Sequence, residues 1–186
     1  GQGPDIVRWG GVRVRLAIPP RARFETARQP DRQIGGAEAS VAAACARLGL
    51  ASAWISALPA NPWGDRVRRE LTGHGVDCAY VQMTEGTRIG TYFLEYGVPP
   101  RPVRVLYDRR DSAFARLTAA QVDWEPVRRA RLVHLTGITP ALGASARGLV
   151  ERAFHEAATV SLWVIMWRSL VPVNPICGMP KSDSQV

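Results

Sequence analysis

Segments with the pattern of buried strands alternate with segments of helical pattern along most of this chain. Strands alternating with helices at this spacing predict an α/β fold, with a parallel sheet that carries helices on its faces. A further short strand, predicted over residues 5–9, is expected to enter at the surface. The other predicted strands are 53–58, 76–82, 131–135 and 159–165, and the predicted helices are 37–48, 61–71, 118–129 and 145–158.

Local signals mark the ends of two of these helices. Gly49 follows the first helix, and glycine is a common residue just past a helix end. Asn61 followed by Pro62 is an N-cap with proline at the first helical position, so the second helix begins there. Gly73 follows that helix as its stop signal.

Three further segments predict a small antiparallel layer beside the main sheet. Residues 87–96 and 103–108 form the clearest strand pair, and the turn residues 97–100 join them. A two-stranded ribbon is marginally stable by itself, so a third strand is needed. Residues 11–18 alternate apolar and polar side chains and supply that strand. The stretch 21–32 is polar and carries no strand pattern.

The chain carries a formal net charge of +8, and almost all of its basic residues are arginines. Such a balance suits an anionic partner: nucleic acid, a phosphorylated ligand or a sugar acid. The arginines are spread along the whole chain, which favours solvated faces over one nucleic-acid-binding surface. We therefore expect no nucleic-acid partner.

Cysteine spacing and hydropathy limit the cellular location and the partners that are expected. Cys45, Cys78 and Cys177 show no metal-ligand or disulfide-framework spacing, so a reducing, cytoplasmic location is expected. His134, in a predicted buried strand, is expected to be a hydrogen-bonded core histidine. The best apolar stretch, 159–167, is under half of the ~20 residues that a membrane helix needs, so no membrane partner is expected.

Several motifs along the chain carry a resemblance to one known family. Residues 35–42, GGAEASVA, open an alanine-rich helix and resemble the first signature of the PfkB (ribokinase-like) carbohydrate kinases. Gly64-Asp65 and Gly75-Val76-Asp77 follow at the expected places. Residues 134–142, HLTGITPAL, resemble 2-keto-3-deoxygluconate kinases in particular. The resemblance implies a ribokinase-like, Rossmann-type sheet with a small β lid made of strands 11–18, 87–96 and 103–108.

The same resemblance implies a division of the chain. Residues 1–158 are expected to form a partial kinase domain, and residues 159–186 a divergent tail, so that the carboxy-terminal half of the fold is missing. The family's G-A-G-D motif, which supplies the phosphate-binding amides and the catalytic base, has no counterpart here. We therefore predict no catalytic residue in this chain. The ATP and Mg²⁺ of the intact family are not expected to bind it well.

The resemblance also implies a site for a sugar acid. In the family, a glycine-pair backbone, two lid tyrosines and one arginine hold the ligand. Arginine grips carboxylates, and tyrosine offers both an apolar ring and a hydroxyl. The alternatives are cross-strand packing for the tyrosines and a solvated loop charge for the arginine. The predicted substrate-binding residues are Gly35, Gly36, Ser40, Tyr92, Tyr107 and Arg109.

Some positions depart from the family pattern. Ser40 replaces an asparagine, Gly11 stands where glutamate is usual, and Asp108 replaces a tyrosine. Two functions remain open. The first is a kinase for 2-keto-3-deoxygluconate or a related sugar acid that is inactive alone. The second is a non-catalytic protein that binds a sugar acid or forms a homodimer through its lid.

Overall fold

Two sheets make up the fold in the computed structural model, which describes residues 3–157 and 164–167. The main sheet has five strands in the order β5-β4-β1-β8-β9, and every neighbouring pair is parallel. The predicted parallel α/β architecture is confirmed. Its strands are β1 (Ile6–Trp9), β4 (Ser52–Pro59), β5 (Val81–Thr84), β8 (Leu132–Thr136) and β9 (Val164–Trp167).

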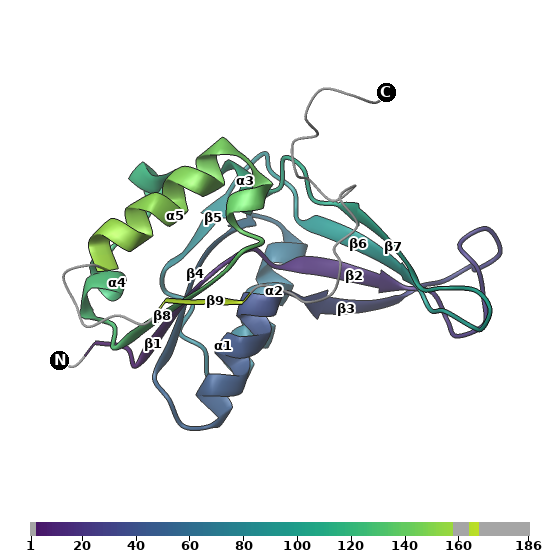
Figure 1. Cartoon of the computed structure of the whole chain (residues 1–186), viewed down its shortest axis with the longest axis horizontal. Coiled ribbons are helices and arrows are strands. Elements are labelled where there is room, and N and C mark those ends of the chain that lie inside the picture. Colours follow the sequence, from purple (N-terminus) through teal and green to yellow (C-terminus); the bar gives the residue numbers. More distant parts are fainter. Residues whose placement is uncertain (1–2, 158–163, 168–186) are drawn as a thin grey trace.

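The second sheet, called the lid here, extends from one side of the main sheet (Figure 1). Its strand order is β3-β2-β6-β7, with β2 parallel to β6 and the other pairs antiparallel. The predicted partnership between the strand near Val12 and the ribbon is confirmed. The lid strands are β2 (Arg13–Ala17), β3 (Asp31–Gly35), β6 (Gly90–Glu95) and β7 (Arg104–Asp108).

Strand β3 was not predicted from the sequence. Its first three residues, Asp31, Arg32 and Gln33, are polar and exposed, and it lies at the edge of the lid. A strand that is solvated in this way shows no alternation of apolar and polar side chains.

Helices cover both faces of the main sheet (Figure 1). One apolar core packs α1 and α2 against one face, and a second packs α3, α4 and α5 against the other. The predicted helices over 37–48 and 61–71 are confirmed, and so is the one over 145–158 as far as residue 157, where the described range ends. The predicted helix over 118–129 divides into a 3-10 turn at Ala119–Gln121 and α4. The helices are α1 (Ala37–Arg47), α2 (Pro62–Gly73), α3 (Ala113–Arg116), α4 (Glu125–Arg129) and α5 (Ala144–Ala157), and a second 3-10 turn spans Pro140–Leu142.

Strand β1 lies at the centre of the main sheet, so the prediction of a strand at the surface was wrong. It pairs with β4 on one side and β8 on the other, and all four of its residues are buried. Trp9 packs on Trp124 from the α4 side, with ring centroids 4.7 Å apart. Arg8 points to the opposite face and is buried. A charged residue in so short a strand is typical of a surface strand, so the sequence gives no sign that this strand is central.

Two other predicted strands differ from the structure. The strand predicted over 76–82 begins only at Val81, and Asp77 forms an isolated bridge to β4. Of the strand predicted over 159–165, Val164 and Ile165 lie in β9. Residues 159–163 and the remainder of the predicted tail, 168–186, lie outside the described residues.

The chain order of the main sheet reverses at its centre. From β1 the chain proceeds to β4 and β5 on one side, and it later adds β8 and β9 on the other. In parallel sheets, ligands bind beyond the carboxyl ends of the strands at such a reversal. The expected place for a ligand is therefore the end of β1 and β8, where Gly10 and Thr136 lie.

We predict that Gly64 and Gly73 of α2 respond oppositely to alanine. A methyl group on Gly64 would lie 2.0 Å from the Pro59 carbonyl oxygen, whereas nothing lies within 4 Å of one on Gly73. Gly64→Ala should lower the free energy of unfolding by about 2 kcal/mol or more, because backbone must move. Gly73→Ala should leave it unchanged or raise it by up to ~1 kcal/mol. Urea denaturation of the two variants measures both, and equal stabilities would contradict the packing described.

Candidate functional site

The glycine pair Gly35-Gly36 lies where the lid meets the main sheet. Gly36 precedes α1, and a methyl group on it would approach the Gly11 carbonyl oxygen to 3.0 Å and Val12 Cγ2 to 3.2 Å. A side chain at position 36 would therefore push apart the turn before α1 and the segment after β1. The pair leaves backbone uncovered at the start of a helix, where amide groups favour oxygen-rich ligands.

Glu38 joins α1 to the carboxyl end of β8. Its Oε1 accepts hydrogen bonds from the hydroxyls of Thr136 and Thr139, the latter at 3.4 Å. The carboxyl group also covers Gly10, because a methyl group on that glycine would lie 2.3 Å from Glu38 Cδ. Only 2% of Glu38 is exposed. A single carboxylate in an alanine-rich helix was the sequence signal for this role, and sequence reasoning missed it.

Two tyrosines of the lid form a stacked pair. Tyr92 of β6 and Tyr107 of β7 are direct cross-strand partners, and their ring centroids lie 5.6 Å apart. The Tyr92 hydroxyl reaches the glycine pair, because a methyl group on Gly35 would lie 2.9 Å from Tyr92 Oη. The stack therefore extends from the edge of the lid to the turn before α1.

Arg109 lies beside this stack. Its guanidinium is 5.2 Å from the centroid of the Tyr107 ring, within the range of a cation–π contact. Arg109 is half-buried, whereas the neighbouring Arg110 is exposed.

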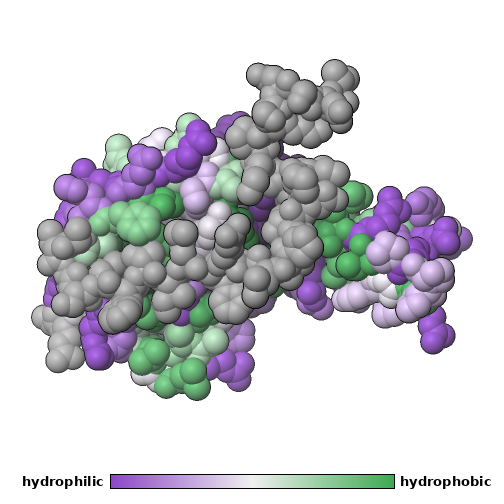
Figure 2. Space-filling model, viewed as in Figure 1, coloured by the Kyte–Doolittle hydropathy of each residue, from purple (hydrophilic) through white to green (hydrophobic). Residues whose placement is uncertain are grey.

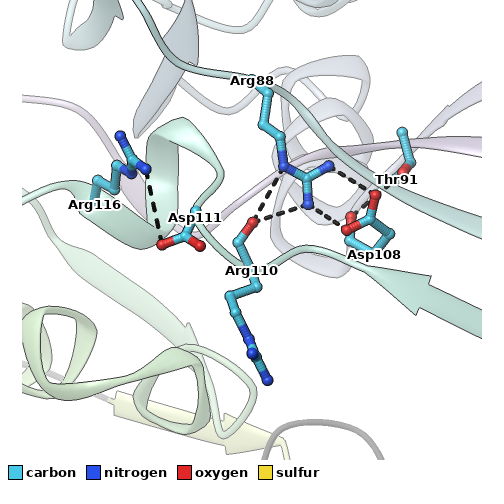
Figure 3. A network of polar contacts seen from close by, with 6 residues as sticks. All are labelled: Arg88, Thr91, Asp108, Arg110, Asp111 and Arg116. Carbon is cyan, nitrogen blue, oxygen red and sulfur yellow. Dashed lines mark hydrogen bonds and ion pairs between the residues drawn. The ribbon is translucent and has the colours of Figure 1, made fainter.

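Arg88 fixes the backbone on both sides of Arg109 (Figure 3). Its guanidinium donates to the Asp108 carboxylate, at 2.9 Å from Nη1, and to the Arg110 carbonyl oxygen, at 3.2 and 2.9 Å. The Thr91 hydroxyl donates to the Asp108 carbonyl oxygen at 3.3 Å. These bonds set the direction in which Arg109 leaves the end of β7.

The structure brings most of the predicted site residues together. Gly35 adjoins Tyr92, Tyr92 stacks on Tyr107, and Arg109 lies over Tyr107. Ser40 lies on an exposed side of α1, one turn beyond Gly36, and its amide donates to the Gly36 carbonyl oxygen at 2.9 Å. Rings, hydroxyls, a guanidinium and uncovered amides suit a hydroxyl-rich, anionic ligand.

A buried arginine, Arg8, lies between the main sheet and α1. Arg8 and His134 are partners across β1 and β8, and Arg8 Nη2 donates to Cys45 Sγ at 3.0 Å. Burial, together with the smaller effect of the Arg8 charge, lowers the pKa of His134 to about 4. His134 is a core residue as expected. However, its Nδ1 has no hydrogen-bond partner within the described part of the chain.

The described ranges contain neither a cluster of metal-ligand side chains nor a membrane-spanning helix. Among residues 3–157 and 164–167, no three His, Cys, Asp or Glu side chains form a group that could hold a metal ion. No helix in those ranges is apolar over a membrane-spanning length. A depression of about 560 Å³ beside Arg68, Thr72 and Cys78 shares no residue with the predicted substrate-binding residues.

Comparison with known proteins identifies relatives over most of the chain. The pattern of the pfkB family carbohydrate kinase matches residues 13–165. The 2-dehydro-3-deoxygalactonokinase of Haloferax volcanii is 38% identical over 89% of this chain and 52% of its own length. The 2-dehydro-3-deoxygluconokinase of Thermoproteus tenax is 34% identical over 68% of this chain and 39% of its own length. The chain thus spans about half the length, or less, of these relatives.

Solved structures share the fold. The 2-dehydro-3-deoxygluconokinase of Thermotoga maritima superposes with a TM-score of 0.80 at 36% identity, covering 88% of this chain and 51% of that one. A sugar kinase from Pyrococcus horikoshii in complex with ATP gives a TM-score of 0.76 at 22% identity, covering 87% of this chain and 52% of that one. The latter likeness supports the fold alone.

We predict that His134 makes the free energy of unfolding depend on pH. Its pKa of about 4 in the folded chain lies below the ordinary value of 6.5, so the unfolded chain binds the proton more readily. Stability is retained above pH ~6.5 and decreases as the pH falls toward 4, by at most about 1.4 kcal/mol per pH unit. Urea denaturation between pH 7 and 4.5 should show a shallower decrease for His134→Gln.

His155→Gln is the matched control, because His155 is exposed on α5. This variant should keep the steeper decrease of the unaltered chain. The carbon-bound ring protons of His134 should also hold a constant NMR shift from pH 7 to 5.5. A titration centred near 6.5 would contradict the burial described.

Proposed function

This chain belongs to the pfkB family of carbohydrate kinases, and we propose that it forms the part of such a kinase that binds a sugar acid. The proposed ligand is 2-keto-3-deoxygluconate or a closely related 2-keto-3-deoxy sugar acid. The relatives named for 2-dehydro-3-deoxy sugars, which is the same chemical class, support this choice. The observation that carries the proposal is the continuous contact from Gly35 through Tyr92 and Tyr107 to Arg109.

Each part of the site suits one part of such a ligand. Arg109 would hold the carboxylate with two parallel, charge-assisted hydrogen bonds. Tyr92 and Tyr107 would lie against the carbon skeleton and direct their hydroxyls to the ligand oxygens. The turn at Gly36 would add amide groups at the start of α1, and Ser40 could add its hydroxyl one turn later.

The reaction of the intact family is phosphorylation of the sugar acid's terminal hydroxyl, for which ATP supplies the phosphoryl group. That reaction needs anion-binding amides for the phosphates and a base for the hydroxyl proton. The sequence contains no G-x-G-D motif, and among the described residues no three His, Cys, Asp or Glu side chains form a group that could hold a metal ion. These residues do not fit ATP and Mg²⁺, so the proposed role is binding of the sugar acid without phosphoryl transfer by this chain alone.

We predict that the chain binds 2-keto-3-deoxygluconate but does not consume ATP with it. Arg109→Met should weaken binding by about 10- to 100-fold, since a hydrogen-bonded charge pair contributes about 1.5–3 kcal/mol. Arg110→Met is the matched control, because the neighbouring side chain is exposed, and it should bind as the unaltered chain does. Isothermal titration calorimetry measures the affinities, and a coupled assay measures ATP consumption.

Either of two results would contradict the proposal. ATP turnover by the purified chain would show that it carries a catalytic base and a phosphate site. Equal losses in the Arg109 and Arg110 variants would show that the sugar acid binds by general charge attraction.

A second candidate function, homodimer formation through the lid, is favoured by the exposure of β7. This strand is at the edge of the lid, and all five of its residues are exposed. Val103, just before it, is 56% exposed, and Leu106 within it is 50% exposed. Hydrophobic surface is visible on the lid between its polar tip and the main body (Figure 2). An unpaired apolar edge strand can pair with the same strand of a second copy.

We predict that light scattering detects a dimer that Leu106→Lys disrupts, because a buried lysine at the interface would lack a partner. Leu48→Lys is the control, since Leu48 is a more exposed leucine located just after α1. That variant should remain dimeric. A monomeric unaltered chain, or equal disruption by both substitutions, would exclude dimer formation through the lid.

A further inference from the structure

A second arginine, Arg13, lies on the same face of the lid as the proposed sugar-acid site. It is the first residue of β2, where it pairs with Gly35 on β3 and with Gly90 on β6. Arg109 lies on the other side of Gly90, one residue beyond the cross-strand pair of Thr91 and Asp108. Glycine and arginine therefore alternate across the four strands of the lid.

Gly90 lies between the two arginines and carries no side chain. A methyl group on Gly90 would lie 3.3 Å from Arg13 Cγ and 3.4 Å from Arg109 Cβ. Strands β2 and β7 flank β6, and neighbouring strands are ~4.8 Å apart, so the two arginine backbones are separated by roughly 10 Å. Because Gly90 has no side chain, residue 90 itself places nothing between the two arginine side chains.

Both guanidinium groups lie against the same aromatic ring. Arg13 is 5.9 Å and Arg109 is 5.2 Å from the Tyr107 centroid. Two like charges held close together repel each other unless an anion lies between them. Burial lowers the pKa of Arg13, and the charge of Arg109 lowers it further.

The protein does not neutralise Arg13 through a direct ion pair. Among residues 3–157, no carboxylate lies within ion-pair distance of its guanidinium. Glu38 acts on Arg13 from farther away, and its Oε1 already accepts hydrogen bonds from Thr136 and Thr139. A half-buried guanidinium without a carboxylate partner in residues 3–157 is suited to an external anion.

We propose that Arg13 is a second carboxylate-binding residue of this site, and that the carboxylate of the sugar acid lies over Gly90 between Arg13 and Arg109. The inference rests on the proposed function and specifies its ligand class as sugar monocarboxylates. A neutral sugar would bring no negative charge to the guanidinium of Arg13. The site should therefore discriminate against uncharged sugars more strongly than a site with one arginine.

The structural alternative is that Arg13 only packs against Tyr107 and keeps its ring in place. This role and the proposed one differ in their dependence on ligand charge. Loss of packing would weaken every ligand that contacts Tyr107, whether charged or neutral. Loss of a carboxylate partner would weaken only the charged ligand.

The test compares 2-keto-3-deoxygluconate with its neutral methyl ester in the full chain, by titration calorimetry and ligand-observed NMR. Arg13→Met should weaken binding of the acid tenfold or more and leave binding of the ester unchanged. The matched control is Arg15→Met, on the same strand two residues farther, where the guanidinium donates to Gln33. This control should bind both ligands as the unaltered chain does. Circular dichroism and thermal unfolding verify that each variant is folded.

Arg13→Lys provides a second test if the methionine variant does not fold. Lysine keeps the charge but loses the planar, two-pronged donor geometry. It should weaken binding of the acid several-fold without affecting the ester.

Each outcome has a distinct meaning. Unchanged affinity for the acid in both Arg13 variants, beside a loss in Arg109→Met, overturns the role of Arg13 and leaves the proposed function in place. Parallel losses for acid and ester assign Arg13 to packing and likewise overturn the inference. Failure of the unaltered chain to bind the acid overturns both proposals.

Discussion

The arrangement of the two sheets depends on the contact between Glu38 and the backbone at Gly10. A buried carboxylate is unfavourable unless hydrogen bonds satisfy it, and the hydroxyls of Thr136 and Thr139 provide those bonds. Any side chain at position 10 would occupy the space that Glu38 fills. Strand β2 begins three residues after Gly10, so this contact also sets where the lid leaves the main sheet. The stacked tyrosines reach the glycine pair because the lid is held there.

How well each element of the fold could be predicted depends on which of its side chains are exposed to water. The second helix was predictable because Asn61 accepts hydrogen bonds from the amides of Trp63 and Gly64, at 3.0 and 3.3 Å, which is the role of an N-cap residue. Strand β1 was misplaced because Arg8 is buried in it, and strand β3 was missed because it is an exposed edge. Pattern recognition uses the contrast between apolar and polar side chains, and both strands lack the usual contrast.

The site also contains residues that could be predicted from the sequence and residues that could not. Tyr92, Tyr107 and Arg109 came from the resemblance to a family, and they lie together in the structure. Sequence reasoning missed Arg13 because its position depends on the register between β2 and β6. It also treated the arginines as solvated charges spread along the chain. Arg8 is buried and Arg13 is half-buried, so part of the basic excess lies inside the fold.

The two candidate functions use different surfaces of the same strand. Successive side chains of a strand point to opposite faces, so Tyr107 and Leu106 of β7 face in opposite directions. Tyr107 lies on the face that carries Arg13, Arg109 and the glycine pair, whereas Leu106 lies on the face with Phe93, its cross-strand partner. A second copy paired along β7 would therefore leave the ligand face open. It would also hold in place the strand from which Arg109 extends, so that dimer formation would favour ligand binding by reducing the freedom of that arginine.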